Sequence, residues 1–351
     1  MSADLACGPT LSIAQPDRLR SLPILLLNVH ENCNCRCLMC DIWKRPAGAE
    51  LSLDMLARLR DSLHNLGVRQ IVLTGGEPLL HTQFEELCRF LKEQNLRITL
   101  LTTGLLLQKR AESVAAWIDE IIISLDGPEA IHDRIRGIKR GFDLIRVGIF
   151  AVRKHRAAMP VHARSVVQRL NFQFLRETVT AAKQLQFDSI SFLAADVTSH
   201  AFNRELVWPV ERQTQVALTS ADVAILEDEI ELLIEQYCSD ITEHYIVESP
   251  QKLRRIARRF REYLGELPPK APLCNAPWVS AVIEVDGSVR PCFFHRSFGS
   301  IENTSLEKVI NSPDAQRFRQ MLDVGKDRIC QKCVCSLNYK RSQEILPIMR
   351  E

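Results

Sequence analysis

The segment CNCRCLMC, residues 33–40, places four cysteines in eight positions directly after an apolar run. Cys33, Cys37 and Cys40 have the spacing C-x3-C-x2-C, and Cys35 lies between the first two. Three thiolates on a four-iron cluster leave one iron open, which is typical of a catalytic centre. A four-cysteine zinc site is the alternative, but structural zinc usually joins two separated cysteine pairs, so four ligands this close would be strained.

The composition is typical of a soluble globular protein. The chain has 351 residues, 46% hydrophobic and 25% charged, with a formal net charge of +2. This length accommodates one domain of roughly 200 residues and a smaller one. The small net charge creates no field toward nucleic acid or a membrane, and no apolar run reaches the roughly 20 residues of a membrane span. Because the N-terminus also lacks a secretory signal, we expect a cytoplasmic protein without nucleic-acid or membrane partners.

The chain contains 12 cysteines, and a reducing compartment requires an explanation for them other than disulfides. Two groups suggest two metal centres. Cys7, Cys88 and Cys238 stand apart, and we expect Cys88 and Cys238 to be small buried core residues. The second group, near the C-terminus, comprises Cys274, Cys292, Cys330, Cys333 and Cys335.

Short apolar runs alternate with amphipathic stretches over the first 205 residues. The runs are rich in Ile, Val, Leu and Thr, and the stretches between them have apolar residues at three- and four-residue spacing. Repeated βα units predict an α/β fold, with a parallel sheet and helices outside it. Six units suit an incomplete barrel or a doubly wound sheet. The expected strands are residues 24–30, 69–74, 97–103, 120–125, 161–167 and 189–195.

The pattern changes after about residue 205. Residues 219–238 predict a helix with Thr or Ser as N-cap, and a basic helix follows. The segment VSAVIEVDGSVRPC predicts a hairpin around Asp286-Gly287, a dipeptide favoured by two-residue type I′ turns. We expect this tail to form a separate small lobe. The expected division is an N-terminal extension 1–22, a barrel 23–205, a helical linker 206–272, a cysteine-rich tail domain 273–340 and a terminal segment 341–351.

A second motif, LTGGEPLL at residues 73–80, lies at the end of the second expected strand. Gly75 and Gly76 allow a small polar group to approach the backbone closely. Pro78 keeps Glu77 out of helical geometry, so the Glu77 carboxylate and the neighbouring carbonyls can face a cationic amine.

With these two motifs the chain resembles the radical SAM enzymes over most of its length. The resemblance implies a partial (β/α)6 TIM-like barrel. It also implies a [4Fe-4S] cluster held by Cys33, Cys37 and Cys40, whose open iron is chelated by S-adenosylmethionine (SAM). Cys35 occupies a position that the family fills with an ordinary residue, and we expect it to be a bystander.

The resemblance also implies a set of SAM contacts. Met39 is expected near the adenine, and the GGEP turn is expected at the methionine amine. The segment ISLDG resembles the family's fourth-strand motif, whose polar residues lie near the ribose or the methionyl carboxylate. The implied SAM-binding residues are Met39, Gly75, Gly76, Glu77, Ser124, Asp126 and, for the carboxylate, Arg164.

The tail resembles the SPASM domain in its shortened Twitch form, in which four cysteines bind one auxiliary [4Fe-4S] cluster. Cys274 precedes the hairpin, G-x4-C ends at Cys292, and Cys330 and Cys333 form C-x2-C. Cys335 departs from the pattern and is either a substitute for Cys333 or spare. Zinc bound by the same four cysteines is the structural alternative. A fully thiolate-ligated cluster suits electron transfer or structural support.

The resemblance implies reductive cleavage of SAM to a 5′-deoxyadenosyl radical, which abstracts a hydrogen atom from an unactivated C–H. Reduction implies a partner such as flavodoxin or ferredoxin. We expect a small polar substrate, such as a sugar, cyclitol or nucleoside derivative, with the auxiliary cluster assisting its oxidation or rearrangement. The alternative is an enzyme that matures ribosomal peptides, although about 23 residues before the first strand are too few for a fused leader-recognition domain. A non-enzymatic iron–sulfur electron carrier is the third possibility.

Overall fold

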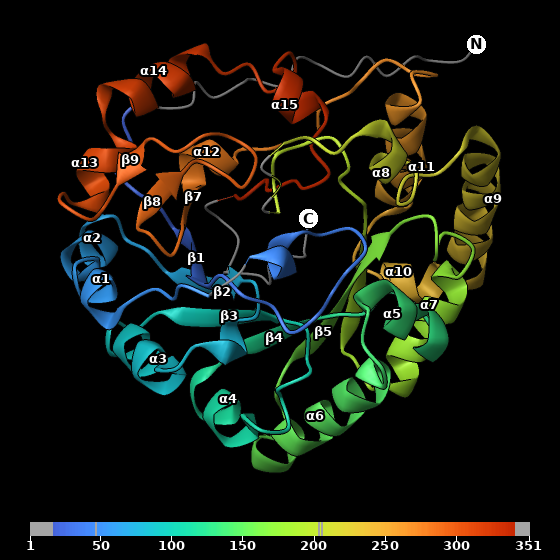
Figure 1. Cartoon of the computed structure of the whole chain (residues 1–351), viewed down its shortest axis with the longest axis horizontal. Helices are drawn as coiled ribbons and strands as arrows, with labels where there is room; N and C mark the ends of the chain where they lie inside the picture. Colours follow the sequence, from blue (N-terminus) through green and yellow to red (C-terminus); the bar gives the residue numbers. More distant parts are fainter. Residues whose placement is uncertain (1–16, 46–47, 203, 205, 341–351) are drawn as a thin grey trace, which may run out of the picture.

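The computed structural model describes residues 17–45, 48–202, 204 and 206–340. Six parallel strands form a curved sheet that does not close into a full barrel (Figure 1). All six expected strands are present, which confirms the incomplete barrel. These strands are β1 (Ile24–His30), β2 (Gln70–Gly75), β3 (Arg97–Thr102), β4 (Glu120–Ser124), β5 (Val161–Val167) and β6 (Ser189–Ala194).

Helices that connect the strands cover the outer side of the sheet (Figure 1). Alternate strand residues such as Leu25, Ile71, Ile98 and Ile121 point outward and are fully buried in one hydrophobic core with these helices, as the two-residue period of a strand requires. The connecting elements are α1 (Leu53–Ala57), α2 (Arg60–Asn65), α3 (Phe84–Glu93), α4 (Ala111–Trp117), α5 (Glu129–Arg136), α6 (Gly141–His155), α7 (Leu175–Gln184) and the 3-10 helices η1 (Ile42–Lys44) and η2 (Pro78–Leu80).

The inner side of the sheet is polar at the amino ends of the strands. Gln70 donates to Thr99 Oγ1 across 2.8 Å, and Thr99 donates to Glu120 Oε1 across 2.5 Å. Arg97 pairs with the same Glu120 carboxylate at 3.0 Å. Because this buried network fills the amino end of the barrel, the carboxyl ends of the strands are left for a functional site.

The tail is joined to the barrel through the sheet. Strand β7 (Ser280–Ile283) pairs in parallel with β1, beginning with Ile24 opposite Ser280. β8 (Ser288–Arg290) and β9 (Gly299–Ser300) follow as antiparallel neighbours, so the strand order is β6-β5-β4-β3-β2-β1-β7-β8-β9. The expected hairpin is therefore present, and it extends the barrel sheet.

The turn of this hairpin differs from the expected type. Glu284 N–H donates to the Ser288 carbonyl and Gly287 N–H donates to the Glu284 carbonyl, both at 2.9 Å. Gly287 has a φ of 78°, and Asp286 is not among the described non-glycine residues with positive φ. A type I′ turn needs positive φ at both central residues, whereas a three-residue loop needs it only at its last residue. Gly287 supplies that conformation, and residues 285–287 form the longer loop.

Two long helices connect the barrel to the tail. α9 (Ser220–Gln236) begins at Thr219, whose hydroxyl forms a capping box with Asp222, which confirms the expected N-cap. α11 (Pro250–Tyr263) packs on α9, and Arg261 of α11 pairs with Glu227 at 2.7 Å. The remaining helices are α8 (Val210–Gln213), α10 (Cys238–Thr242), α12 (Ala276–Val279), α13 (Leu306–Ile310), α14 (Pro313–Met321) and α15 (Arg328–Gln331).

Of the two cysteines that we expect in the core, Cys88 and Cys238, one is exposed. Cys88 is buried on α3, as expected, but Cys238 is exposed, so the prediction for Cys238 is wrong. Helix α9 ends at Tyr237, and Cys238 opens the short helix α10 instead of continuing the buried face of α9. Cys7 lies outside the described residues.

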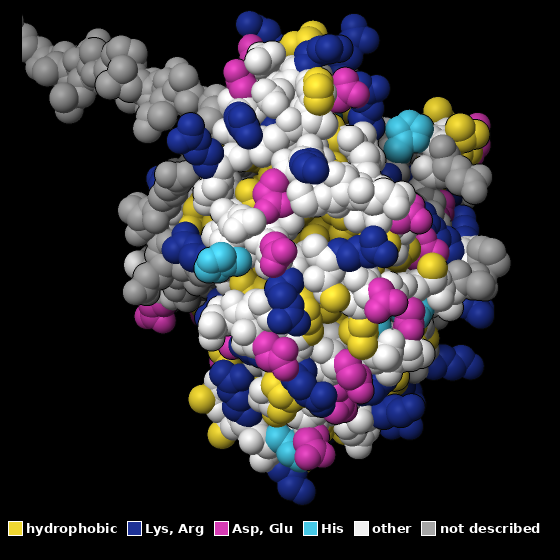
Figure 2. All heavy atoms as spheres, turned by 90° about the vertical axis from the view of Figure 1, so that its left-hand side faces the viewer, with side chains coloured by type: hydrophobic (Ala, Val, Ile, Leu, Met, Phe, Trp, Pro, Cys, Tyr) yellow, Lys and Arg dark blue, Asp and Glu magenta, His cyan; other side chains and the backbone are white. Residues whose placement is uncertain are grey.

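Acidic and basic side chains alternate on the face that carries α1, α2 and α13 (Figure 2). Hydrophobic side chains occupy only small areas between them in this view. A mixed surface of this kind gives that face no field of a single sign. Among the described residues, none of the helices is long and apolar enough to cross a membrane.

Candidate metal centres

The first cysteine loop follows β1 and is held from outside by the end of α5. Arg36 N–H donates to the Arg136 carbonyl across 2.9 Å, and Leu38 N–H donates to the Ile135 carbonyl across 3.1 Å. Gly137, with a φ of 64°, ends α5 where an added Cβ would lie 2.8 Å from the Arg36 carbonyl oxygen. The loop is therefore fixed by backbone contacts to an element about 100 residues later in the chain.

Four thiols meet in this loop. Cys35 and Cys37 are buried, while Cys33 and Cys40 are partly exposed. Hydrogen bonding to Cys33 and Cys37 raises the pKa of Cys35. Hydrogen bonding from Cys35 lowers the pKa of Cys37 to about 6, and the Arg136 charge lowers it further, against the effect of burial. The Cys35 thiol thus lies beside two predicted ligands, and the ligand set of Cys33, Cys37 and Cys40 stays a prediction.

The GGEP turn packs directly on the cysteine loop. Gly76 N–H donates to the His30 carbonyl across 2.7 Å, and Glu77 N–H donates to the Asn32 carbonyl across 2.9 Å. A Cβ at Gly76 would lie 1.9 Å from the Asn32 carbonyl oxygen, and one at Gly75, whose φ is 133°, would lie 2.5 Å from the His30 carbonyl oxygen. The two glycines are needed because two backbones meet here without room for side chains.

The Glu77 side chain is fully buried and has its own partners. Its Oε1 accepts from Leu79 N–H at 3.1 Å and from Thr102 Oγ1 at 2.8 Å. Its Oε2 accepts from the backbone N–H and hydroxyl of Thr103 at 2.7 and 2.6 Å. Burial raises the pKa of Glu77, and these hydrogen bonds oppose the rise. An ionised carboxylate has about four acceptor positions. These four hydrogen bonds therefore occupy the Glu77 carboxylate, which joins the ends of β2 and β3.

Two of the expected SAM-binding residues lie side by side at the carboxyl ends of the strands. Ser124 of β4 is registered opposite Arg164 of β5. Arg164 Nε lies 3.5 Å from the hydroxyl of Ser191 on β6. Both side chains project from neighbouring strands, and both are partly exposed.

Asp126, which follows β4, is fully buried and is already paired. Its Oδ1 accepts from Val166 N–H at 2.8 Å, and its Oδ2 lies 2.7 Å from Arg136 Nη2. The second guanidinium nitrogen, Arg136 Nη1, lies 3.5 Å from Cys37 Sγ. The sequence analysis did not identify Arg136, because no local pattern links the end of α5 to the cysteine loop.

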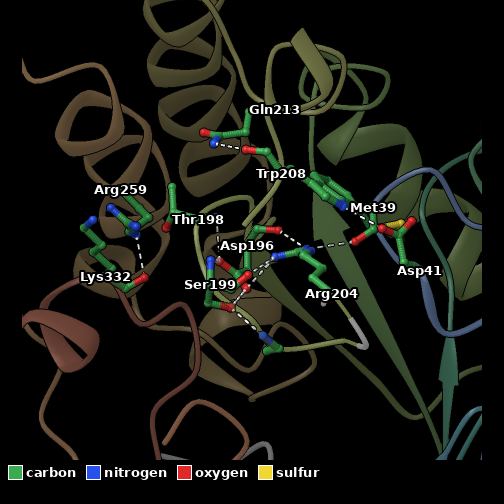
Figure 3. A network of polar contacts seen from close by, with 11 residues as sticks. Met39, Asp41, Asp196, Thr198, Ser199, Arg204, Trp208, Gln213, Arg259 and Lys332 are labelled. Carbon is green, nitrogen blue, oxygen red and sulfur yellow. Dashed lines mark hydrogen bonds and ion pairs between the residues drawn. The ribbon is translucent and has the colours of Figure 1, made fainter. Parts of the chain in front are cut away.

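The described residues after β6 (196–202, 204 and 206–213) contact the cysteine loop along a second side, and we call them the strap (Figure 3). Arg204 donates to the Met39 carbonyl across 3.2 Å and pairs with Asp196 at 3.0 Å. Trp208 donates to Asp41 across 2.6 Å. The Arg204 and Arg212 guanidinium groups lie 4.1 and 4.7 Å from the centroid of the Trp208 indole ring, and such cation–π contacts stabilise the strap.

Met39 is buried against this wall. The amide of Gln168, the residue after β5, donates to Met39 Sδ across 3.5 Å, while Gln168 Oε1 accepts no hydrogen bond from any of the described residues. Sequence reasoning missed Gln168 and the strap, since neither carries a spacing that points to the cysteine loop.

The tail cysteines gather in one site. Burial raises the pKa of Cys292 to about 11, and the negative charges of Cys274 and Cys335 add to the rise. Burial raises the pKa of Cys333 as well, and Cys335 and Cys292 contribute. Mutual effects of this kind require thiols within electrostatic range of one another. Burial also raises the pKa of Cys335 to about 11, while the charge of Arg164 lowers it.

A histidine that the sequence analysis missed lies in the same site. His295 Nε2 is 3.4 Å from Cys330 Sγ and 3.7 Å from Asp327 Oδ1. The imidazole packs edge-on against Phe318, with 4.9 Å between ring centroids. Burial lowers the pKa of His295, although Asp327 opposes the shift.

The tail cysteine site is anchored to helix α11. Arg259 of α11 is buried, and its Nε donates across 3.1 Å to the carbonyl of Lys332, between Cys330 and Cys333 (Figure 3). On the other side of the tail, Asn275 N–H donates to the Leu337 carbonyl across 2.7 Å. The tail loop is therefore anchored to the helical linker as well as to the sheet.

The donor sets of both sites fit iron–sulfur clusters. Each site brings several thiols together in a partly buried loop, and thiolate is the usual protein ligand of such clusters. Beside the first site, Gly75 and Gly76 allow the GGEP turn to pack against the backbone of the cysteine loop.

Comparison with protein families gives two matches. The Radical SAM superfamily matches residues 27–167, which contain the first cysteine loop, the GGEP turn and β1 to β5. An iron–sulfur cluster-binding domain, SPASM, matches residues 274–334, which contain four of the five tail cysteines. The two domains imply a SAM-binding [4Fe-4S] cluster and an auxiliary iron–sulfur cluster.

Several curated proteins are similar to parts of the chain. The AdoMet-dependent heme synthase of Methanosarcina barkeri is 32% identical over 44% of this chain and 45% of its own length. The GTP 3′,8-cyclase of Marinobacter nauticus is 35% identical over 50% of this chain and 54% of its own length. The subtilosin biosynthesis protein AlbA of Bacillus subtilis is 26% identical over 86% of this chain and 62% of its own length. The chain thus spans about half the length of these relatives, and somewhat more of AlbA.

Solved structures share the fold. SuiB of Streptococcus suis bound to S-adenosylmethionine has a TM-score of 0.61 at 16% identity, covering 91% of this chain and 74% of its own. The structure of anSMEcpe with bound AdoMet has a TM-score of 0.63 at 19% identity, covering 89% and 86%. The part of the chain with the first cysteine loop, residues 27–167, is therefore a Radical SAM domain, and the tail, residues 274–334, is a SPASM iron–sulfur cluster-binding domain.

Proposed function

We propose that this protein is an enzyme that cleaves SAM reductively and abstracts a hydrogen atom from an unactivated C–H of its substrate. The observation that carries the proposal is the backbone contact between the GGEP turn and the cysteine loop, through Gly76 to His30 and Glu77 to Asn32. This contact places a glycine surface beside three thiols with the C-x3-C-x2-C spacing. When bound, the cluster and SAM supply one-electron chemistry that yields a 5′-deoxyadenosyl radical.

The residues of the chain have separate tasks in this proposal. Cys33, Cys37 and Cys40 would hold the first cluster. The carbonyls of the Gly75–Glu77 turn would accept the methionine amine, because the Glu77 carboxylate is already occupied. Ser124 and Arg164, which are neighbours across β4 and β5, would bind the ribose and the carboxylate, and Met39 would contact the adenine. Asp126 would act indirectly, through Arg136.

The tail would hold the auxiliary cluster. Cys274, Cys292, Cys330 and Cys333 are the proposed ligands, and Cys335 is the substitute for Cys333. The two residues are in direct contact, because the Cys333 thiol donates to the Cys335 carbonyl across 2.8 Å. The cluster would accept an electron from the substrate radical. The enzyme also needs a reducing partner such as flavodoxin or ferredoxin.

A peptide is the substrate class that the relatives support best. The alignment with AlbA, a bacteriocin biosynthesis protein, spans barrel, linker and tail, because it covers 86% of the chain. The alignments with the heme synthase and the GTP cyclase cover about half of the chain. We therefore place the peptide ahead of the small polar molecule that the sequence favoured.

A small polar substrate is the second candidate. The observation that favours it is the similarity to the GTP 3′,8-cyclase of Marinobacter nauticus, which is 35% identical over 50% of this chain.

Anaerobic reconstitution with iron and sulfide tests the activity. With dithionite and SAM, the chain should release 5′-deoxyadenosine, and a variant with Cys33, Cys37 and Cys40 all changed to Ala should not. Cys238→Ala, which removes an exposed thiol outside both sites, is the matched control and should behave as the parent. Equal release by the parent and the triple variant would contradict the proposal.

Deuterium transfer separates the two substrate classes. Extract from host cells grown in deuterated medium is divided by size and supplied to the reconstituted enzyme. A peptide substrate should place deuterium in 5′-deoxyadenosine from the larger fraction, and protease treatment should abolish the transfer. Transfer from the small, protease-resistant fraction would favour the small polar molecule instead.

A further inference from the structure

One predicted ligand sulfur in each cysteine site lies within hydrogen-bond distance of a nitrogen on a neighbouring side chain. In the first site, Arg136 Nη1 lies 3.5 Å from Cys37 Sγ, and Asp126 holds the other end of the guanidinium at 2.7 Å. Arg136 and Asp126 are both buried, so the contact is shielded from water. The backbone carbonyl of Arg136 also accepts from Arg36 N–H, which fixes the guanidinium against the loop.

The tail site has the same arrangement with different chemistry. His295 Nε2 lies 3.4 Å from Cys330 Sγ, with Asp327 Oδ1 at 3.7 Å from the same nitrogen. A lone pair on Nε2 would face a sulfur and a carboxylate oxygen, so the electrostatics favour the tautomer with the proton on Nε2. The Asp327 carboxylate is held in turn by Ile329 and Cys330 N–H at 2.9 and 2.8 Å.

We propose that Arg136 and His295 are positioning residues that set the reduction potentials of the two clusters, each by donating an N–H to one ligand sulfur. The inference rests on the proposed function, in which Cys37 and Cys330 are cluster ligands. A donor to a ligand sulfur stabilises the more negative, reduced cluster and raises its potential. Arg136 provides a positively charged donor, whereas His295 provides a single N–H. The reduction potential of each cluster is therefore set by a different kind of donor.

The contact between His295 and Cys330 suits the proposed role of the tail cluster as an electron acceptor. An acceptor of electrons from a substrate radical must be reducible, and the His295 N–H favours its reduced state. In the barrel, the Asp126 carboxylate offsets the charge of Arg136, so the guanidinium acts mainly through its directed N–H.

For the first site, removing Arg136 alone would leave Asp126 buried without its partner, which destabilises folds. The test therefore uses the double variant Asp126→Asn/Arg136→Met, in which Asn can still accept from Val166 N–H. Redox titration followed by electron paramagnetic resonance, without SAM and at one pH, should give a more negative potential for the first cluster only. The tail cluster in the same sample is the internal control. Arg136→Lys keeps the positive charge but loses the planar guanidinium group that contacts Asp126 and Cys37 at once. Its first cluster should have a reduction potential between those of the parent and the double variant.

For the tail site, His295→Phe keeps an aromatic ring against Phe318 and removes the donor. His295→Gln keeps an N–H donor. Both are measured in the background that lacks Cys33, Cys37 and Cys40, so that only the tail cluster contributes to the signal. His295→Phe should have a more negative potential than the parent, and His295→Gln should lie close to it.

Several results would overturn the inference while leaving the proposed function intact. Fully loaded variants with parental potentials would show that the donors do not set the potentials. Loss of the tail cluster from folded His295→Phe would make His295 a ligand. An empty first site in both Arg136 variants would make Arg136 a requirement for cluster assembly. Failure of the proposed function is recognised separately, by iron that persists when the predicted cysteine ligands are removed.

Discussion

The backbone N–H of Glu77 donates to the carbonyl oxygen of Asn32 across 2.9 Å, joining the turn after β2 to the loop after β1. The neighbouring contact, from Gly76 to His30, lies in the same interface. Two motifs that are about 40 residues apart in the sequence therefore form one backbone unit. Any side chain at Gly76 would have to open this unit.

Gly76→Ala should impair the first site. The added Cβ would lie 1.9 Å from the Asn32 carbonyl oxygen, so the cysteine loop must shift. We expect a loss of stability of about 1–3 kcal/mol, the usual cost of overpacking, together with a several-fold lower iron occupancy of the first cluster. Thermal unfolding and iron analysis would measure both. Gly325→Ala is the control, because the nearest atom there belongs to the movable Asp323 side chain. Parental iron content in Gly76→Ala would contradict the tight packing.

Iron content tests the two ligand sets. Two [4Fe-4S] clusters give about eight irons and eight sulfides per chain. The variant with Cys33, Cys37 and Cys40 changed to Ala should keep about half of this iron, since the tail site is untouched. Full retention of iron would show that these three cysteines are not the ligands.

Cys35→Ala tests the fourth cysteine of the first loop. We expect parental iron content and parental SAM cleavage, because the family spacing assigns Cys35 no bond to iron. The thiol lies beside Cys33 and Cys37, so its removal should alter packing and not ligation. The spectrum of the first cluster in the Cys35→Ala variant tests this expectation. Loss of that spectrum would place Cys35 among the ligands.

The stability of the protein should depend on Glu248. This carboxyl is buried and accepts from Phe192 N–H at 2.9 Å. Burial raises its pKa to about 7, against the hydrogen bond and the nearby Lys252. Since the folded pKa lies above the unfolded one, the contribution of Glu248 is greatest at acid pH and is lost as the pH rises through about 7.

Glu248→Gln removes this titration while the amide oxygen can still accept from Phe192. Between about pH 5.5 and 7.5 the parent should lose about 2 kcal/mol of unfolding free energy relative to the variant. Anaerobic denaturant titrations of both proteins at three pH values give this difference, in which all other titrating groups cancel. A difference that does not change with pH would mean that the carboxyl is not buried in solution.

The sheet could be predicted from the sequence because its strands are short apolar runs with local boundaries. The GGEP and cysteine motifs could be placed at strand ends for the same reason. Arg136 could not be assigned to the cluster loop, since its contact with Cys37 spans 99 residues and depends on how α5 ends. Cys238 was misjudged because the end of α9 is set by tertiary packing, which periodicity does not report.

The contacts of the strap could not be predicted from the sequence either. Arg204 and Trp208 contact Met39 and Asp41 over more than 160 residues, and their segment has no regular pattern. Asp126 follows β4, and its ion pair with Arg136 changed the role proposed for it from the direct SAM contact that the resemblance implied. Side-chain partners of this kind follow from the fold and not from spacing.

The pairing of β1 with β7 has a consequence for the order in which the chain assembles during translation. β1 leaves the ribosome early, but its partner residues 280–283 are made about 250 residues later. Until then the outer edge of β1 is an unpaired strand edge, which can recruit other chains. The cysteine-rich tail therefore covers the free edge of β1 as well as carrying thiols, and a nascent chain must be protected at β1 until the tail emerges.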